Sequence, residues 1–235
     1  NVWGADHHGY VSRMKAAVGA LGQDPSNLKV SITQMVNLQR GGQEVKLSKR
    51  TGEIVELSEV VKEVGSDAAR FTYLLQSIDS AQTFDLELAA SSINENPVFY
   101  VQYAYARIQS MKRKAKENSF IILPANEINF SLLGHERELL LIRALYELPE
   151  VVERACRELS PHQITTWVRE LASDLHSFYH DCRVLGDEVD PALTQARFFL
   201  LEAVQIGLEV SMDLLGVSTP EEMWRDDEEV EGVKL

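Results

Sequence analysis

The spacing of apolar residues changes along the chain and divides it into two parts. Residues 1–3 predict the end of a buried strand, and after a polar turn apolar residues recur at helical spacing over residues 11–21, with Gly22 closing the helix. Residues 29–37 then alternate apolar and polar side chains, which is typical of a strand. A strand, turn, helix and second strand predict one piece of an α/β unit.

Over residues 40–94 the apolar pattern is irregular, and it predicts only short elements. Residues 40–53 are rich in Gly, Lys and Arg and predict a loop, with a short extended piece at Val45–Leu47. Ser58 and Ser66 are each placed to cap a short helix. The pattern lapses over residues 79–94, where we expect a domain boundary.

From residue 96 onward the pattern is helical throughout. Asn96, Ser160 and Asp190 each precede a proline, and a capping side chain before a proline predicts a helix start. Two helices carry long apolar stripes with alternating spacings of four and three, which must bury against each other as in an antiparallel bundle. One stripe comprises Ile164, Val168, Leu171, Leu175, Phe178, Cys182 and Leu185, closed by Gly186; the other comprises Leu193, Ala196, Leu200, Ala203, Gly207, Val210 and Leu214, closed by Gly216. The second part is therefore predicted as an all-α bundle of four or five helices.

Composition narrows the class of protein. With 235 residues, 45% of them hydrophobic and 25% charged, the chain has ordinary globular composition and can bury a core without disulfides or metals. The two cysteines, Cys156 and Cys182, fall in apolar stripes and are expected to be reduced core residues. No run approaches 18 apolar residues and no basic-then-apolar leader opens the chain, so we expect a cytoplasmic protein without a membrane span.

The net charge of −13 at first speaks against a nucleic-acid partner, but its distribution changes that interpretation. Residues 1–77 carry 9 basic and 8 acidic side chains, and residues 78–118 carry 5 of each. Residues 119–220 carry 7 basic and 16 acidic side chains, and residues 221–235 carry 2 and 7. The first half is therefore close to neutral, and local basic clusters in it remain available to an anion.

The densest basic cluster is Lys46–Arg50 (K-L-S-K-R), which lies between Gly41-Gly42 and Gly52. Lys46 and Lys49 are three residues apart and can converge on one polyphosphate, where ammonium charges stabilise developing pyrophosphate. A position after an α/β strand favours a ligand site. A solvated basic turn explains the same string and stays open.

A second candidate is the turn Gly4–Gly9 (G-A-D-H-H-G), which follows the first strand. Asp6 suits a ribose hydroxyl, and His7 or His8 can stack on or hydrogen-bond a base. Zinc binding by the same residues competes with this interpretation, but a structural zinc site needs further close-set ligands. A capping role for Asp6 at the following helix is the third possibility.

Two other clusters have plainer explanations. Tyr100, Tyr103, Tyr105 and Arg107 precede Met111–Lys114 on one helix, so that aromatic and cationic side chains could stack bases, although core packing and a solvated helix end explain them as well. His176 and His180 are four apart beside Asp181, but no glutamate completes an H-E-x-x-H pattern, which favours surface or packing roles.

Taken together, these motifs resemble bacterial arginyl-tRNA synthetases of class I over residues 1–224. The motifs that carry the resemblance occur in the same order and spacing as in the family. They are Trp3–Tyr10, Gln34–Leu38, Lys46–Arg50, Gly65–Phe71, Asn94–Val98, Tyr100–Ala104, Leu214–Val217 and Pro220–Met223.

The resemblance implies an ATP site in the first part of the chain. Lys46–Lys49 looks like the K-M-S-K-S signature, with Leu47 in place of Met and Arg50 in place of the last Ser, which makes Lys46 and Lys49 the expected catalytic residues. The expected ATP-binding residues are Asp6, His7, His8, Met35, Val36 and Ser48. ATP would be a substrate together with Mg²⁺, with no organic cofactor and no resident metal site.

For the second part, the resemblance implies a helical domain that binds the anticodon of tRNA-Arg. Tyr179 and Met223 match positions that shape the anticodon pocket, and Arg183 stands where some relatives carry an aromatic residue. Asn96 and Tyr100 complete the tRNA-binding residues that we expect. The D-A-L-R signature of the domain is echoed only loosely by Ala192–Arg197.

The resemblance also implies a fold and a division of the chain. We expect the α/β remnant of a Rossmann-type catalytic domain over 1–55, a helical connector over 56–93, an α-helical anticodon-binding domain over 94–224 and an acidic tail over 225–235. The first class I signature, H-I-G-H, does not occur in these 235 residues. We therefore expect part of a monomeric arginine–tRNA ligase that does not aminoacylate alone, with a non-catalytic tRNA-binding module or a helical scaffold as the alternatives.

Overall fold

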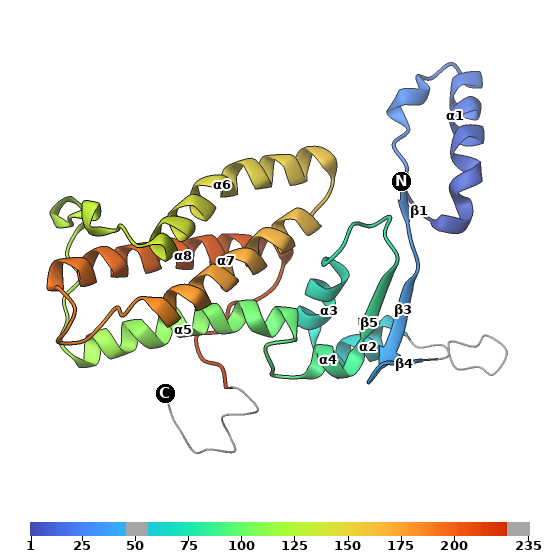
Figure 1. Ribbon diagram of the computed structural model, residues 1–235. Helices are drawn as coiled ribbons and strands as arrows, with labels where there is room; N and C mark the ends of the chain where they lie inside the picture. Colours follow the sequence, from blue (N-terminus) through green and yellow to red (C-terminus); the bar gives the residue numbers. More distant parts are fainter. Residues whose placement is uncertain (46–55, 225–235) are drawn as a thin grey trace.

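The computed structural model describes residues 1–45 and 56–224, and within them the two predicted parts are both present (Figure 1). The N-terminal segment folds as strand, helix and strand and projects from the rest of the molecule. Its strands β1 and β2 pair in parallel, with Val2 opposite Ser31 and Gly4 opposite Thr33. The elements of this segment are β1 (Val2–Gly4), η1 (Ala5–Tyr10), α1 (Val11–Ala20), η2 (Pro25–Asn27) and β2 (Ser31–Thr33).

A second sheet joins this segment to the helices. Its strand order is β4-β3-β5, and β3 pairs antiparallel with β4 and in parallel with β5. Short helices flank the sheet and connect it to the bundle (Figure 1). The elements of this region are β3 (Val36–Arg40), β4 (Gln43–Glu44), α2 (Leu57–Val64), α3 (Ser66–Tyr73), β5 (Gln82–Asp85) and α4 (Leu86–Ala90).

Four long helices form the bundle, which confirms the predicted all-α second part. The helix α5 packs on α7 and α8, and α6 packs on the same two helices. The bundle elements are α5 (Pro97–Glu117), η3 (Ala125–Glu127), η4 (Phe130–Leu132), α6 (Glu136–Glu158), α7 (His162–Asp181) and α8 (Pro191–Leu215). A continuous core runs from Leu38 and Phe84 at the sheet to Phe178 and Phe198 in the bundle. The helices of the described residues include none long and apolar enough to cross a membrane.

The strand predictions need three corrections. The stretch 29–37 contains two strands, because the strand is interrupted at Gln34 and Met35, where the chain passes from the first sheet to the second. The loop also contains a strand that was not predicted, Gln43–Glu44, which forms a hairpin with β3 across Gly41-Gly42, whereas most of the extended piece expected at Val45–Leu47 lies outside the described residues. Residues 79–94, where the pattern lapsed, contain β5 and α4; β5 was missed because its hydrogen-bonding partner is a strand more than forty residues away in the chain.

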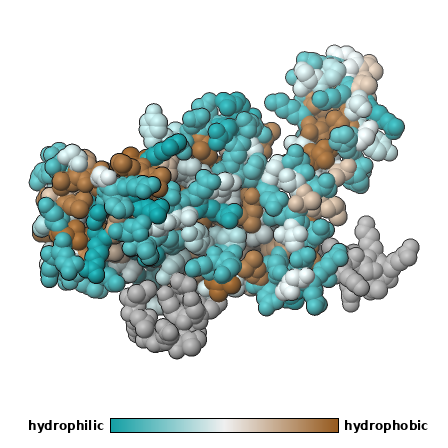
Figure 2. Space-filling view, in the orientation of Figure 1, coloured by the Kyte–Doolittle hydropathy of each residue, from teal (hydrophilic) through white to brown (hydrophobic). Residues whose placement is uncertain are grey.

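The burial predictions were partly wrong as well. The strand β1 is present, but Val2 is exposed, because within the described residues β1 has only β2 beside it. Figure 2 shows apolar side chains gathered at the surface of this segment around α1. Cys182 is buried as expected, whereas Cys156 is exposed.

Two predicted caps were confirmed and three were not. The side chains of Asn96 and Asp190 accept backbone N–H groups at the starts of α5 and α8. Ser58 and Ser66 are instead inside their helices, because Glu56 caps α2 through a capping box with Glu59 and Gly65 precedes α3. Ser160 does not cap α7, which begins after Pro161.

The ends and buried faces of the last two helices also differ in part from the pattern. The helix α8 ends at Gly216 in the left-handed conformation as predicted, but α7 ends at Asp181, before Gly186. On α8 the stripe residues Val210 and Leu214 are exposed. The buried face includes Phe198, Leu201, Val204, Leu208, Ser211, Met212 and Leu215. The predicted stripe therefore follows only one edge of the buried face of α8, which is wider than the stripe.

Candidate nucleotide and nucleic-acid sites

The turn after β1 lies at the carboxyl edge of a parallel strand pair. Asp6, His7 and His8 belong to the 3-10 helix η1, which contacts both β1 and β2. All three side chains are exposed, and the imidazole Nε2 of His7 lies 3.5 Å from Oδ2 of Asp6. Neither η1 nor α1 has a side-chain N-cap, so the capping role for Asp6 is excluded. The turn therefore presents polar side chains where ligands of parallel sheets bind.

Met35 and Val36 follow the other strand of that pair, β2, after one intervening residue, Gln34. The Met35 side chain is exposed, and its backbone carbonyl accepts a hydrogen bond of 3.4 Å from the N–H of Gln82. Val36 begins β3 opposite Gln82. The break between β2 and β3 thus joins the carboxyl edge of the first sheet to the start of the second.

The residues expected to contact phosphates, Lys46, Ser48 and Lys49, lie outside the described residues. The acidic tail over 225–235 lies outside them too. The described residues do include the hairpin that leads into the basic stretch, since its second strand, β4, ends at Glu44, one residue before Val45. The N–H of Val45 donates a hydrogen bond of 2.9 Å to the carbonyl of Leu38, so the chain is still bonded to the sheet at the last residue before the basic stretch.

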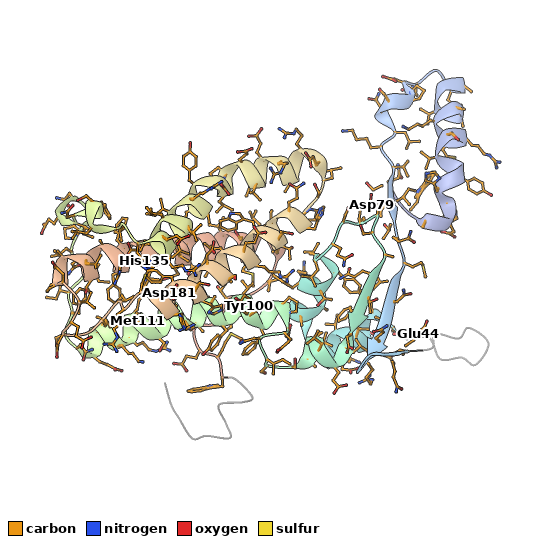
Figure 3. All side chains as sticks on the ribbon, viewed as in Figure 1. Glu44, Asp79, Tyr100, Met111, His135 and Asp181 are labelled. Atoms are coloured by element: carbon orange, nitrogen blue, oxygen red, sulfur yellow. The ribbon has the colours of Figure 1, made fainter. Side chains whose placement is uncertain are left out.

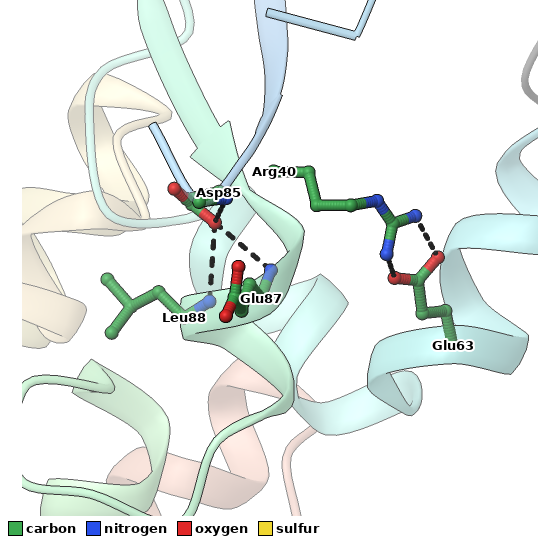
Figure 4. Close-up of polar contacts among 6 residues, drawn as sticks. Arg40, Glu63, Asp85, Glu87 and Leu88 are labelled. Atoms are coloured by element: carbon green, nitrogen blue, oxygen red, sulfur yellow. Dashed lines mark hydrogen bonds and ion pairs between the residues drawn. The ribbon is translucent and has the colours of Figure 1, made fainter. Parts of the chain in front are cut away.

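Asp85 fixes the turn of that hairpin (Figure 4). Its carboxylate accepts the N–H groups of Gly41 at 3.3 Å and Gly42 at 2.9 Å, and it also caps α4 through Glu87 and Leu88. These backbone donors, Gly42 above all, lower the pKa of Asp85 against a smaller opposing effect of burial. One carboxylate thereby ties the hairpin to the helix that follows β5.

On the bundle, two hollows lie side by side along α5. The Tyr179 hollow is lined by Met111, Lys114, Glu117, Asn118, Tyr179, Cys182, Arg183, Val184 and Leu185. The Met223 hollow, of about 240 Å³, is lined by Tyr103, Ala106, Arg107, Ser110, Arg113, Lys114, Glu117, Glu222, Met223 and Trp224. Lys114 and Glu117 line both, so the structure brings together three of the five predicted tRNA-binding residues, namely Tyr179, Arg183 and Met223.

Tyr179 connects the two hollows through Arg107. The Arg107 guanidinium carbon lies 4.5 Å from the centre of the Tyr179 ring, within cation–π distance. The phenolic oxygen is buried and has no hydrogen-bond partner among the described residues. Burial raises the pKa of Tyr179 and outweighs the opposite effect of Arg107, so the hydroxyl stays protonated. A buried donor without a partner is a costly arrangement that a ligand can relieve.

Arg183 is exposed beside Tyr179, and its position is set by α8. Its guanidinium pairs with Glu188 at 2.9 Å, and its backbone carbonyl accepts a hydrogen bond from Arg197. Arg197 also pairs at 2.6 Å with Glu138, whose side chain is 1% exposed, while that of Arg197 is 11% exposed. This buried pair fixes the end of α7 against α6 and α8.

The segment that carries Met223 is anchored by a second polar cluster. Oδ2 of Asp67 accepts the N–H of Ser218 at 3.1 Å, the Ser218 hydroxyl, and Nε2 of Gln102 at 3.0 Å. Gln102 also donates to the Ser218 carbonyl at 2.9 Å. Residues of α3 and α5 thus hold the chain just after α8, and this cluster has no signature in the sequence because Asp67 and Ser218 are 151 positions apart.

Asn96 and Tyr100 lie elsewhere. Asn96 is 3% exposed, and its amide group is engaged with Val98, Ala89 and Ser91, so the structure gives its side chain a helix-capping role. Tyr100 packs on His176 with ring centres 4.6 Å apart. Figure 3 shows Tyr100 and Met111 at separate places along α5, and Tyr100 lines neither hollow. Contact of these two residues with tRNA stays a prediction.

The histidine and tyrosine candidates from the sequence have partners within the bundle. His176 lies with its Nδ1 3.1 Å from Arg107, and His180 pairs with Asp181 at 2.7 Å. Over residues 1–45 and 56–224, no three His, Cys, Asp or Glu side chains cluster as metal ligands would. The Tyr105 hydroxyl donates to Glu209 at 2.7 Å and the ring is in the core.

Sequence reasoning did not assign Trp224 to a site, and it left Arg107, Arg113 and Lys114 between base stacking and a solvated helix end. Arg107 and Lys114 are seven positions apart and share one face of α5, a spacing that the sequence displays. Trp224 follows Met223 directly, so the signal available in the sequence was an aromatic residue beside a predicted site residue. Its proximity to α5 depends on the fold.

Comparisons with known proteins agree with this geometry. Residues 101–223, about half of the chain, match the family described as the DALR anticodon binding domain. Arginine–tRNA ligases of Carboxydothermus hydrogenoformans and Dehalococcoides mccartyi are 47% and 51% identical over 223 residues, 95% of this chain. The chain spans 40% and 39% of the length of these two relatives.

Comparison with solved structures also finds an arginyl-tRNA synthetase. A Campylobacter jejuni structure named as an arginyl-tRNA synthetase superposes with a TM-score of 0.81 at 30% identity, covering 95% of this chain and 47% of that one. The matched span 101–223 contains most of α5, all of α6, α7 and α8, and every lining residue of the two hollows except Trp224. The chain therefore belongs to the DALR anticodon-binding domain family.

Proposed function

We propose that this chain is part of an arginine–tRNA ligase, in which its bundle binds the anticodon loop of tRNA-Arg. The observation that carries the proposal is the convergence of Tyr179, Arg183 and Met223 on two adjoining hollows along α5. Both hollows combine aromatic and cationic side chains, the composition that holds unpaired bases and their phosphates. The similarity to named arginine–tRNA ligases supports the choice of tRNA.

In the proposed reaction, the arginine carboxylate attacks the α-phosphate of ATP, which gives arginyl-adenylate and releases pyrophosphate. The 3′-terminal adenosine of tRNA then takes the arginyl group and AMP leaves. Lys46 and Lys49 would stabilise the phosphates as negative charge develops on pyrophosphate. Mg²⁺ would accompany the ATP phosphates, because this ion is commonly held by phosphates together with one or two carboxylates.

The turn after β1 would hold the nucleoside of ATP. Asp6 is the ribose partner in this proposal, His7 and His8 lie beside the adenine, and the backbone at Met35 and Val36 meets its ring edge. Ser48 would complete the phosphate loop. The position of η1 at the carboxyl edge of the β1–β2 pair supports this assignment.

The remaining assignments follow from the same proposal. The catalytic part would comprise residues 1–55, the connector 56–93, the anticodon-binding domain 94–224 and the tail 225–235. The strand β5 belongs to the connector in sequence and pairs with β3 of the catalytic part, which would couple the two rigidly. As an enzyme of translation, the protein would act as a monomer in the cytoplasm.

The proposal is tested by equilibrium binding of fluorescently labelled tRNA-Arg and of a non-cognate tRNA to the 235-residue chain. We expect cognate binding to be tighter, and Tyr179→Ala and Arg183→Ala to weaken it by about tenfold each, the range of one lost base contact. Lys46→Ala should leave tRNA affinity unchanged, since its proposed partner is ATP. Arg143→Ala, at an exposed α6 residue that pairs with Glu147 and lines neither hollow, is the matched control. Equal affinity for both tRNAs, or equal effects of Arg183→Ala and Arg143→Ala, would refute the proposal.

A further inference from the structure

Trp224 gives the Met223 hollow a large exposed aromatic face. Its residue is 62% exposed, whereas Trp167 is buried and donates its indole N–H to the Ala144 carbonyl at 3.1 Å. The Met223 hollow thus has an indole face that the protein core does not use. Indole rings are large, rigid and amphipathic, which suits them to stack on a flat partner.

Cations on α5 face the same hollow. Arg107 and Lys114 are two helical turns apart on one side of the helix, and Arg113 adjoins them. An aromatic face beside guanidinium and ammonium groups is the combination that proteins use to hold single-stranded bases. The composition of the hollow therefore points to nucleic acid.

The acidic residues of the hollow decide which part of a nucleotide fits. Glu117 and Glu222 line it as well, and Arg113 lies 3.8 Å from Glu222 and donates to the Glu221 carbonyl at 3.4 Å. Two carboxylates offset most of the charge of three cations, so a dianionic group gains little here. An uncharged base that stacks on the indole meets no such repulsion.

The indole is also tethered. The Asp67, Gln102 and Ser218 cluster fixes the chain six residues before Trp224, and Arg113 contacts the two glutamates in between. A side chain on a fixed segment loses less conformational entropy on binding than one on a free end. Stacking on Trp224 is correspondingly more favourable.

We propose that Trp224 is a base-stacking residue, which holds one unpaired base of the tRNA anticodon loop in the Met223 hollow. The inference rests on the proposed function and adds a second base site to the one at Tyr179. Because Lys114 and Glu117 line both hollows, the two bases are close neighbours in the loop.

The test measures binding of an RNA hairpin that carries an arginine anticodon loop. Trp224→Ala weakens this binding by about 5- to 150-fold, the range that loss of one base–aromatic stack produces, and Trp224→Phe retains most of it. Tyr146→Ala is the control, since Tyr146 is 86% exposed on α6 and lines neither hollow. Circular dichroism confirms that the variants are folded.

Abasic sugars placed at each loop position in turn identify the base. The position that stacks on Trp224 is the one at which base removal and Trp224→Ala are no longer additive. If the hairpin binds and Tyr179→Ala weakens it, but Trp224→Ala matches Tyr146→Ala, the Trp224 site is refuted and the anticodon function stands. If the unaltered chain does not bind the hairpin or tRNA-Arg, both proposals fail.

Discussion

The hydroxyl of Tyr179 is in an unusual position, and removing it gives a sharp prediction. The oxygen is buried without a hydrogen-bond partner among the described residues, while the ring contacts the Arg107 guanidinium. A buried polar group without a partner costs about 1–3 kcal/mol of desolvation free energy. Tyr179→Phe removes that cost and leaves the ring in place. We therefore expect the free energy of unfolding to rise by about 1 kcal/mol.

A matched control predicts the opposite sign. Tyr105 is buried on α5, and its hydroxyl donates to Oε1 of Glu209 at 2.7 Å. Tyr105→Phe loses this hydrogen bond and leaves a carboxylate with one partner fewer, so the free energy of unfolding should fall by about 1 kcal/mol. The two substitutions delete the same atom, and only the partner differs.

Urea unfolding at pH 7, followed by circular dichroism, measures both effects. The midpoint should rise for Tyr179→Phe and fall for Tyr105→Phe with unchanged slopes, and the corresponding melting temperatures should shift by about 2–4 °C in each direction. Destabilisation of Tyr179→Phe by as much as Tyr105→Phe would mean that the Tyr179 hydroxyl has a partner in the native protein, and the reasoning would be wrong. If the hydroxyl serves the anticodon, the same variant also binds tRNA-Arg more weakly despite its greater stability.

Three further predictions concern charge. Glu138→Gln leaves the buried Arg197 without its counter-charge and should lower the free energy of unfolding by about 3 kcal/mol, with partial recovery when Arg197→Met is added; no recovery would refute a penalty from unpaired charge. Asp85→Ala should cost about 1 kcal/mol at pH 7. Because the folded pKa of Asp85 is lowered, its stabilisation is present above the unfolded pKa of about 4 and is lost as pH falls through the folded value, so melting curves of the variant and the unaltered chain should converge in acid. Finally, tRNA-Arg affinity should drop steeply between about 50 and 200 mM salt, and a flat response in filter binding would argue against a phosphate interface.

Local sequence signals determined much of this protein. Asn96-Pro97 and Asp190-Pro191 start α5 and α8 as predicted, because a cap and a proline act within one turn of the helix. Gly216 ends α8 as predicted, because glycine readily adopts the left-handed conformation that terminates a helix. Helical periodicity likewise predicted a bundle, because an apolar stripe on a long helix has to be covered.

Predictions from the sequence were less accurate where the structure of a segment depends on residues far away in the chain. The strand β5 has no alternating pattern of its own and is a strand because β3 supplies its hydrogen bonds. Capping was misjudged at Ser58, where a glutamate box competes successfully with the serine. Cys156 followed an apolar pattern and is nevertheless exposed, since the pattern does not say how wide the buried face is.

For the functional sites the division is similar. The sequence by itself offered Asp6 and Lys46 as nucleotide-binding candidates, because the motifs around them are short and local, whereas Tyr179 became an anticodon candidate only through the family resemblance. Only the tertiary structure decided that Tyr179 and Met223 line adjoining hollows along α5 and that Asn96 is buried as a cap. The physical reason is that a site is assembled by packing, and packing joins side chains such as Asp67 and Ser218 that the sequence keeps 151 positions apart.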